Sequence, residues 1–251
     1  MKFRKHNIVL LLGMQLSFLF AMANKENDAA LFYKNGDFEK AAIAYEQMIK
    51  QSPANAALYY NLGNAYYKSG EIAKSILNFE RALRINPADE DVIYNLRLAN
   101  LQTVDKIEPV PQVFYQKWWY GFIAGTSLNI RSYTVIICLW LTLIFFIVYL
   151  FSIKYGLRQF SFFASLICLV LTLTFWYVAS SQSKILNDTP EAIIFATNPY
   201  VKSSPDDKGA NLFMLHDGTK VTILDELKGW KKIRIANGNE GWIDEKALEK
   251  I

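Results

Sequence analysis

The hydrophobic positions of the chain fall into four successive patterns. An apolar run covers residues 8–20, helically spaced apolar positions cover 24–104, two uncharged runs cover 133–151 and 160–178, and short alternating runs cover 190–251. Apolar positions three or four residues apart predict amphipathic helices, uncharged runs of about 20 residues predict membrane spans, and alternation predicts strands. The sequence therefore predicts a multidomain fold with all-α helical hairpins, a two-helix transmembrane hairpin and a small all-β barrel.

The chain begins with a targeting pattern. A basic start precedes the apolar run Ile8–Phe20, and Ala21-Met22-Ala23 follows it. Thirteen helical residues rise about 20 Å, which is short of the roughly 30 Å of a bilayer's hydrocarbon. The pattern predicts a secretory signal peptide over residues 1–23. The alternative is an uncleaved anchor, which leaves the next domain on the same side of the membrane.

A period of 34 residues runs through the helical region. Pro53 and Pro87 lie 34 residues apart, and Phe32-Tyr33-Lys34-x-Gly36 aligns with Tyr66-Tyr67-Lys68-x-Gly70. Apolar positions recur at helical spacing on both sides of each glycine, which predicts helical hairpins. Each proline is expected to end the second helix of its unit, because proline lacks an N–H group. A small residue, Gly63, allows the paired helices to approach closely.

These units resemble the tetratricopeptide repeat. The second unit, Leu58–Pro87, matches the family pattern closely, whereas the first unit has Lys25 where the family favours tryptophan. A third first-helix, Val92–Ala99, resembles a capping element, and the repeat domain is expected to cover residues 24–104. The resemblance implies a superhelix whose inner face, built from the first helix of each unit, binds extended peptides.

The residues expected to face this groove combine amides, tyrosines and two lysines. Asparagine amides can pair with both the N–H and the C=O of a ligand backbone, and tyrosines offer flat apolar contact. The predicted groove residues are Asn27, Tyr33, Lys34, Tyr60, Asn61, Asn64, Tyr67, Lys68, Tyr94 and Asn95. The asparagines at 27, 61 and 95 recur at the 34-residue period. The alternative is that these asparagines only satisfy neighbouring turns.

Two long apolar segments predict membrane spans. Tyr133–Phe151 and Phe160–Val178 contain 19 residues each and no charged side chain, so each can cross a bilayer as a helix. The predicted loop 152–159 is short, which makes the two spans antiparallel. The segment Trp118-Trp119-Tyr120, in a linker over residues 105–132, suits the membrane–water boundary. Neither span holds an ionisable group, which argues against a transporter or a proton relay.

Basic residues near the spans do not decide the orientation of the hairpin. Lys154 and Arg158 lie in the loop, while Lys117, Arg131 and Lys184 lie on the other side. A signal peptide exports the repeat domain, and antiparallel spans then return the chain to the same side. The sequence predicts a multi-pass protein of the inner (cytoplasmic) membrane, with a cytoplasmic loop and both soluble domains periplasmic. Short linkers would hold both domains over one patch of membrane, where a shared partner meets a raised effective concentration.

The positive charge of the chain is concentrated around the apolar segments. The formal net charge is +4, but residues 24–108 carry 10 basic and 12 acidic side chains, and residues 182–251 carry 10 and 11. The excess lies in residues 1–23, with +3, and in residues 109–181, with +4. This distribution suits membrane insertion and argues against a nucleic-acid partner. The two cysteines lie within the predicted spans and are interpreted as small hydrophobes, so no disulfide, metal or cofactor is expected.

The C-terminal region has the pattern of short strands. Five β-rich runs cover residues 191–196, 200–203, 219–224, 230–236 and 240–243. Asn237-Gly238 between two of these runs is a strong hairpin signal. Five strands in about 60 residues indicate a small barrel. The motifs Gly229-Trp-Lys-Lys-Ile and Asn237-Gly-Asn-Glu-Gly-Trp-Ile closely resemble those of the bacterial SH3-like domain, and the resemblance covers nearly all of residues 192–251.

Three aromatic residues of this domain are candidates for a binding face. Trp230 and Trp242 are interpreted first as core residues whose indole N–H groups reach backbone carbonyls. The alternative is that they line a groove for a peptide or the cell wall together with Tyr200. His216 precedes Asp217-Gly218 and is interpreted as a turn residue rather than as a base. No exported Cys or Ser is paired with a histidine, so the sequence predicts no hydrolytic triad and no enzyme.

The order of segments resembles the E-member family of the Bacteroides aerotolerance (Bat) operon proteins. The segments Tyr94–Asn100 and Asp105–Glu108 fit the same resemblance. The resemblance implies that the protein acts together with von Willebrand-type membrane proteins and a cytoplasmic ATPase in an envelope stress or aerotolerance system. The favoured function is a membrane-anchored scaffold that mediates protein–protein interactions through the repeat groove and the SH3-like domain. The alternatives are a cell-wall tether that uses the SH3-like domain, and an enzyme or its regulatory subunit.

Overall fold

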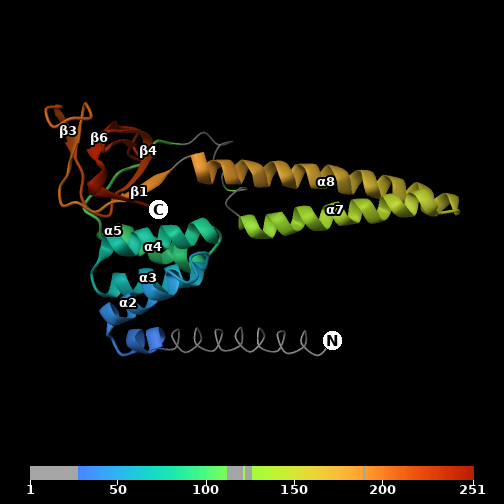
Figure 1. Cartoon of the computed structure of the whole chain (residues 1–251), viewed down its shortest axis with the longest axis horizontal. Helices are drawn as coiled ribbons and strands as arrows, with labels where there is room; N and C mark the ends of the chain where they lie inside the picture. The colour runs from blue at the N-terminus through green and yellow to red at the C-terminus, as the bar shows by residue number, and fades with distance from the viewer. Residues whose placement is uncertain (1–27, 112–120, 122–125, 189) are drawn as a thin grey trace, which may run out of the picture.

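The computed structural model describes residues 28–111, 121, 126–188 and 190–251. These residues form a stack of short helices, a long helical hairpin and an antiparallel sheet. The hairpin extends to one side, while the stack and the sheet lie against each other at its other end (Figure 1). The predicted signal peptide, Asn27 and the Trp118-Trp119-Tyr120 segment lie outside the described residues.

The helical stack confirms the hairpins that the 34-residue period predicts. Residues 28–34 are helical. The helices that follow are α2 (Phe38–Ile49), α3 (Ala56–Lys68), α4 (Ile72–Ile85) and α5 (Glu90–Gln102). Gly36 and Gly70 occupy the turns with φ of +84° and +85°, a conformation that glycine adopts without the cost of a Cβ clash. The two aligned glycines therefore reverse the chain at the same point of each unit.

Close packing between α3 and α4 depends on the absence of a side chain at Gly63. A Cβ placed on Gly63 would lie 2.6 Å from Cδ1 of Phe79, which is a buried residue of α4. The Ser75 hydroxyl donates a hydrogen bond of 2.8 Å to the carbonyl of Gly63. The small residue expected between the paired helices is confirmed.

The two prolines differ in how they relate to the helix ends. Pro87 directly follows Asn86, the C-cap of α4, as expected. The last residue of α2 is Ile49, before Pro53 is reached, so the expectation that Pro53 ends this helix is wrong. The amide of Ser52 donates both to Met48 O, at 3.0 Å, and to Ile49 O, at 3.1 Å. These bonds tighten the last turn and satisfy its carbonyls before the proline.

The long hairpin consists of α7 (Leu128–Phe151) and α8 (Tyr155–Asp188). Residues Ile130–Phe151 and Tyr155–Gln182 are long and apolar enough to cross a membrane. The turn between the helices covers only residues 152–154, which is shorter than the 152–159 loop that the sequence predicts. Helical hydrogen bonding continues through polar residues, because it depends on the backbone and not on apolar side chains. The guanidinium of Arg158 lies 5.3 Å from the Tyr149 ring.

A buried polar cluster joins the two helices at the end opposite the turn. Arg131 is 6% exposed, and its Nη1 donates 3.0 Å to Oε1 of Gln182. The amide Nε2 of Gln182 donates 3.1 Å to the carbonyl of Thr126. The ends of the hairpin that lie nearest the soluble domains are therefore joined by hydrogen bonds as well as by apolar packing.

The C-terminal sheet has seven strands rather than the five that the sequence predicts. They are β1 (Glu191–Ile194), β2 (Tyr200–Lys202), β3 (Asn211–Met214), β4 (Lys220–Leu227), β5 (Trp230–Arg234), β6 (Glu240–Asp244) and β7 (Leu248–Lys250). The order is β3-β2-β6-β5-β4-β1-β7, and every pair is antiparallel. The two strands missed by the sequence pattern are the outermost ones, β3 and β7. Gly238, with φ of +91°, lies in the predicted hairpin turn between β5 and β6.

Candidate peptide groove and the interface between the two domains

Side-chain hydrogen bonds connect the first helices of the second and third units. Nδ2 of Asn95 donates to Oδ1 of Asn64 at 2.8 Å and to the hydroxyl of Tyr60 at 3.2 Å. Further toward the C-terminal ends of the same two helices, Nε2 of Gln102 donates 2.6 Å to the hydroxyl of Tyr67. The structure therefore brings four of the predicted groove residues together across α3 and α5. It adds Gln102, which lies 34 residues after Lys68 but is not among the predicted groove residues.

The other predicted groove residues are placed less uniformly. Tyr94 is 59% exposed, Asn61 is partly exposed, and Lys34 and Lys68 are exposed. The ring of Tyr33 packs edge-on against Phe38, with 5.3 Å between centroids. Tyr33 thus contributes to packing within the first hairpin.

A cavity of about 850 Å³ lies at the end of this groove where α3 and α5 begin. Its walls come from the turn between α2 and α3 and from the turn between α4 and α5. The lining residues are Ser52, Pro53, Ala54, Asn55, Ala56, Ala57, Tyr60, Asn86, Asp89 and Asp91. Two of these residues cap the helices: Asn55 Oδ1 accepts from the Ala57 amide at 3.0 Å, and Asp89 Oδ1 accepts from the Val92 amide at 3.3 Å.

The three aromatic candidates of the sheet lie on its outer face. Trp242 of β6 is paired with Lys202 of β2 and with Lys232 of β5. Trp230 is partly buried, with Lys202 Nζ 5.7 Å from its ring, and Tyr200 is 53% exposed. Neither tryptophan belongs to the buried core of the sheet. The interpretation of both as core residues is therefore wrong.

The alternation of the strands explains this placement. The inward positions of β5 are Lys231 and Ile233, and those of β6 are Gly241 and Ile243. Lys231 turns inward although it is charged, because its ammonium pairs with Glu226 at 2.6 Å and with Glu245 at 3.5 Å. Since side chains alternate along a strand, the tryptophans next to these positions face outward.

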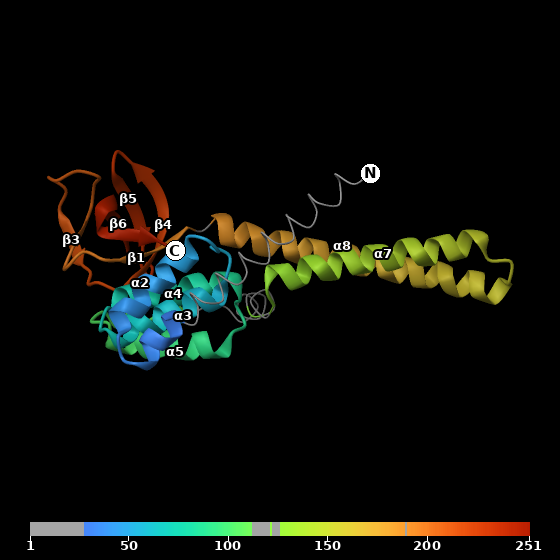
Figure 2. The ribbon, with the colours of Figure 1, turned by 60° about the horizontal axis from the view of Figure 1, so that its bottom comes forward.

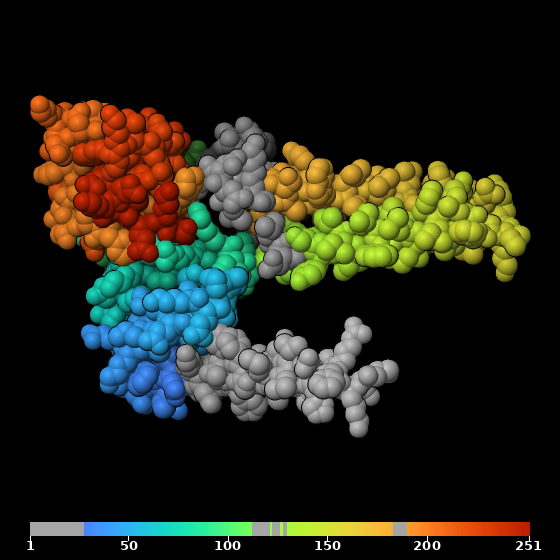
Figure 3. Space-filling model, in the orientation of Figure 1, coloured from blue at the N-terminus to red at the C-terminus, as the bar shows by residue number. Residues whose placement is uncertain are grey.

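The sheet packs directly against the repeat stack, a contact that the sequence does not predict. Ile193 of β1 is fully buried in the same apolar cluster as Ala73, Ile76 and Leu77 of α4. Phe195 and Ile251 pack against this cluster at its edge. Figure 2 shows the sheet next to the helices in a second view, and Figure 3 shows that the two surfaces meet.

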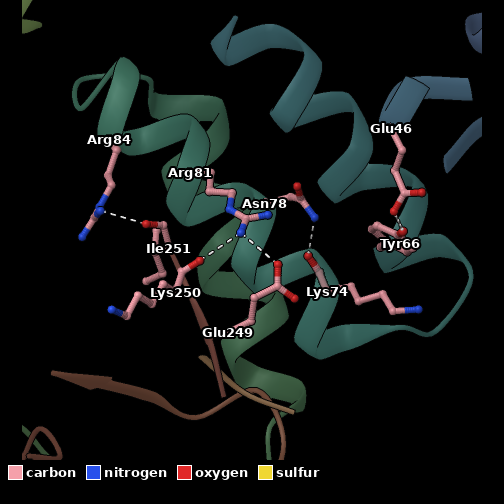
Figure 4. A network of polar contacts seen from close by, with 9 residues as sticks. All are labelled: Glu46, Tyr66, Lys74, Asn78, Arg81, Arg84, Glu249, Lys250 and Ile251. Carbon is pink, nitrogen blue, oxygen red and sulfur yellow. Dashed lines mark hydrogen bonds and ion pairs between the residues drawn. The ribbon is translucent and has the colours of Figure 1, made fainter. Parts of the chain in front are cut away.

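Ion pairs surround this apolar contact. Nη2 of Arg81 lies 2.9 Å from Oε1 of Glu249 and donates 2.9 Å to the carbonyl of Lys250, and Arg84 Nη1 donates 2.8 Å to Ile251 O (Figure 4). On another side, the ammonium of Lys220 lies 2.9 Å from carboxylates of both Glu80 and Glu191. Burial by itself lowers the pKa of Lys220, but the two carboxylates outweigh it and raise the pKa.

The segment after α5 completes the interface. Oδ2 of Asp105 accepts from the amide of His216 at 2.8 Å and from the hydroxyl of Thr219 at 2.6 Å, and Oδ1 lies 2.7 Å from Nδ1 of His216. Ile107 packs on the core of the sheet, and the amide of Val110 donates 3.0 Å to Ala236 O. The first part of the predicted linker is therefore bound to the sheet, and His216 holds Asp105 in addition to forming a turn.

The sheet covers the second helix of the repeat and leaves the groove accessible. Its hydrogen bonds to the stack described above are made with Glu80, Arg81 and Arg84 of α4 and with the segment after α5. The groove residues Tyr60, Asn64 and Asn95 belong to the first helices, α3 and α5. A ligand in the groove and the docked sheet therefore use different faces of the stack.

Comparisons with known proteins agree with both soluble parts. A family model described as "TPR repeat" matches residues 29–70, and one described as "Tetratricopeptide repeat" matches residues 56–89. A model described as "Bacterial SH3 domain" matches residues 197–249. No curated protein matches the chain.

Among solved structures, the chain is similar to "MamA 41-end from Desulfovibrio magneticus RS-1" at 24% identity. The match covers 31% of this chain and 44% of that chain, so it spans less than half of the solved protein, and the TM-score is 0.30. A similarity of this extent establishes neither a shared fold nor a shared function. The family models agree with the fold: residues 29–89 are similar to TPR repeats, and residues 197–249 are similar to a bacterial SH3 domain.

Proposed function

We propose that the protein is a membrane-anchored scaffold of the cell envelope that captures an extended peptide segment of a partner in its repeat groove. TPR repeats and bacterial SH3 domains are typically non-catalytic interaction modules, which supports a scaffold rather than an enzyme. In this proposal α7 and α8 cross the inner membrane, and both soluble domains lie on its periplasmic side. The partners are membrane proteins of the same complex, with von Willebrand-type proteins as the first candidates.

The observation that carries this proposal is the polar row of Tyr60, Asn64 and Asn95 on an accessible face. Hydrogen-bonded amides and hydroxyls held at fixed positions can pair with a peptide backbone without first being ordered, which reduces the entropic cost of binding. The row lies on the face that the sheet leaves uncovered. A scaffold needs such a surface when its other face is already occupied by its own second domain.

The test is partner capture by the full-length protein in mild detergent. Asn61→Ala combined with Asn95→Ala is expected to reduce recovery of co-purifying membrane proteins. The double variant also loses the two hydrogen bonds that Asn95 donates to Asn64 and Tyr60, at about 0.5–1.5 kcal/mol each, so capture is compared at a temperature where each variant is folded. Asn100→Ala is the matched control, since Asn100 is exposed on the same helix as Asn95. Unchanged capture by the double variant, or equal loss in the control, would contradict a peptide groove.

A second function, tethering to the cell wall, is favoured by the outer face of the sheet. Tyr200, Trp230 and Trp242 lie on neighbouring strands with Lys202 between them, and aromatic faces bind sugar rings and peptides alike. Retention of the full-length protein on isolated cell wall, lost in Tyr200→Ala, would support the tether. Capture of membrane proteins without wall retention would exclude it.

A further inference from the structure

The cavity where α3 and α5 begin has a one-sided charge. Of the described part of the chain, ten residues line its volume of about 850 Å³, and the charged ones among these ten are Asp89 and Asp91. Both are acidic, so the walls carry no positive charge that would balance a carboxylate of a ligand. The exposed lysines of the groove, Lys34 and Lys68, lie at the opposite ends of their helices. Among the described groove and cavity residues named above, the acidic ones therefore lie at one end and the lysines at the other.

The two aspartates differ in how far the fold already uses them. Asp89 is the N-cap of α5: its Oδ1 accepts from the Val92 amide at 3.3 Å, and its Oδ2 accepts from Asn86 Nδ2 at 3.2 Å. Asp91 is exposed, and among the described residues its carboxylate takes part in no hydrogen bond or ion pair. It is thus the carboxylate that a ligand can reach without disturbing the helix cap.

A favourable helix dipole alone accounts for only part of this arrangement. Carboxylates in the first turn stabilise a helix, and this explains why Glu90 and Asp91 both follow the cap of α5. Glu90 receives the same benefit, yet it does not line the cavity. Glu90 and Asp91 therefore differ in one respect. Both carboxylates lie in the first turn of α5, where the helix dipole favours them, but of these two only Asp91 lines the cavity, together with Tyr60.

We propose that the ligand of the repeat groove is a basic peptide, with a lysine or arginine side chain that enters this cavity and pairs with Asp91. This inference rests on the proposed function and names the class of its ligand. Tyr60 joins the two parts of the site, because it lines the cavity and also accepts from Asn95 in the polar row. Its ring offers an apolar and cation-attracting surface to the ligand side chain. The volume of the cavity suits one long side chain with neighbouring backbone.

The experiment is a selection from a displayed library of random heptapeptides on the full-length protein in nanodiscs. The wild-type protein is expected to enrich peptides with lysine or arginine several-fold over the input library. Asp91→Asn is expected to lose this preference for basic residues, while Glu90→Gln behaves as the wild type. One enriched peptide is then synthesised with its basic residue and with glutamine in its place. The replacement is expected to weaken binding about tenfold to the wild type and to leave binding to Asp91→Asn nearly unchanged.

The outcomes separate this inference from the proposed function. Enrichment of acidic or neutral peptides, or equal effects of Asp91→Asn and Glu90→Gln, overturns the basic-ligand class. If Asn61→Ala with Asn95→Ala abolishes peptide retention in the same assay while Asp91→Asn changes nothing, the groove function stands and the ligand class is wrong. If the wild type enriches no peptides above that double variant, both proposals fail. Circular dichroism melts of each variant confirm that the comparisons are made on folded protein.

Discussion

Removing the carboxylate of Asp105 is the sharpest test of the contact between the two soluble domains. Asp105 lies just after the repeat stack and accepts from the amide of His216 and the hydroxyl of Thr219, and its other oxygen contacts the ring of His216. Asp105→Ala deletes these contacts without adding a clash. The variant is therefore expected to weaken docking of the sheet on the stack without unfolding either part.

The size of the effect follows from which donors are left without a partner. Thr219 is only 6% exposed, so its hydroxyl has little access to water after the change, and a buried unpaired donor costs about 1–3 kcal/mol. His216 is more exposed, with 24% of its side chain accessible, and water can replace its partner. Together the loss is expected to be about 2–3 kcal/mol of docking free energy, or roughly a 30- to 150-fold change in the docking equilibrium.

Hydrogen exchange read by mass spectrometry on the full-length protein measures this change. Amides of residues 105–111 and of His216–Thr219 are expected to exchange faster in Asp105→Ala, while those of α3 and of β5 stay protected. Asp217→Ala is the matched control, because Asp217 is an exposed carboxylate in the same turn. Asp105→Asn removes the negative charge but keeps one acceptor oxygen. Comparing it with Asp105→Ala therefore separates the effect of the charge from the effect of the hydrogen bonds. Equal exchange in Asp105→Ala and Asp217→Ala would refute the reasoning.

The same carboxylate predicts how docking depends on pH. Burial by itself raises the pKa of Asp105, but hydrogen bonds from Thr219 and His216 outweigh burial, and the pKa is lowered. A carboxyl group with a lowered pKa contributes stability above its unfolded pKa of about 3.9 and loses that contribution as the pH falls through the folded value. The wild type is therefore expected to lose more docking stability below about pH 4 than Asp105→Asn does.

Three further predictions follow from other parts of the molecule. Gly63→Ala places a Cβ 2.6 Å from the Phe79 ring and is expected to destabilise the repeat stack by about 1–3 kcal/mol. The measurement is a lower Tm, and an unchanged Tm would show that α3 and α4 can move apart at no cost in stability. Cysteines introduced at Ser69 and Ser203 in a Cys-free background are expected to react with an impermeant thiol reagent on outer-membrane-permeabilised cells, whereas one at Gly156 is not; the reverse pattern would invert the proposed orientation. Lys220→Met removes the partner of both Glu80 and Glu191 and is expected to loosen docking at neutral pH in the same exchange assay, with Lys246→Met, at an exposed position, as the control.

Several features of this protein are determined by the sequence itself, because they depend on spacing within a short stretch of chain. Apolar positions at helical intervals around Gly36 and Gly70 produce the repeat hairpins, and Asn237-Gly238 produces the hairpin of β5 and β6. The long uncharged runs produce α7 and α8. In each case the backbone conformation follows from residues within one or two turns of each other.

Other features required the tertiary structure, because they join positions that no local pattern relates. The edge strands β3 and β7 have three or four residues and little alternation, so only their pairing partners define them. The sequence favours Trp230 as a core residue, but Lys231 takes the inward position next to it, where its ammonium pairs with the carboxylates of Glu226 and Glu245. Asp105 and His216 are 111 residues apart. Their contact forms only when the folded repeat stack and the folded sheet pack together. It therefore cannot be predicted from the spacing of residues along the chain.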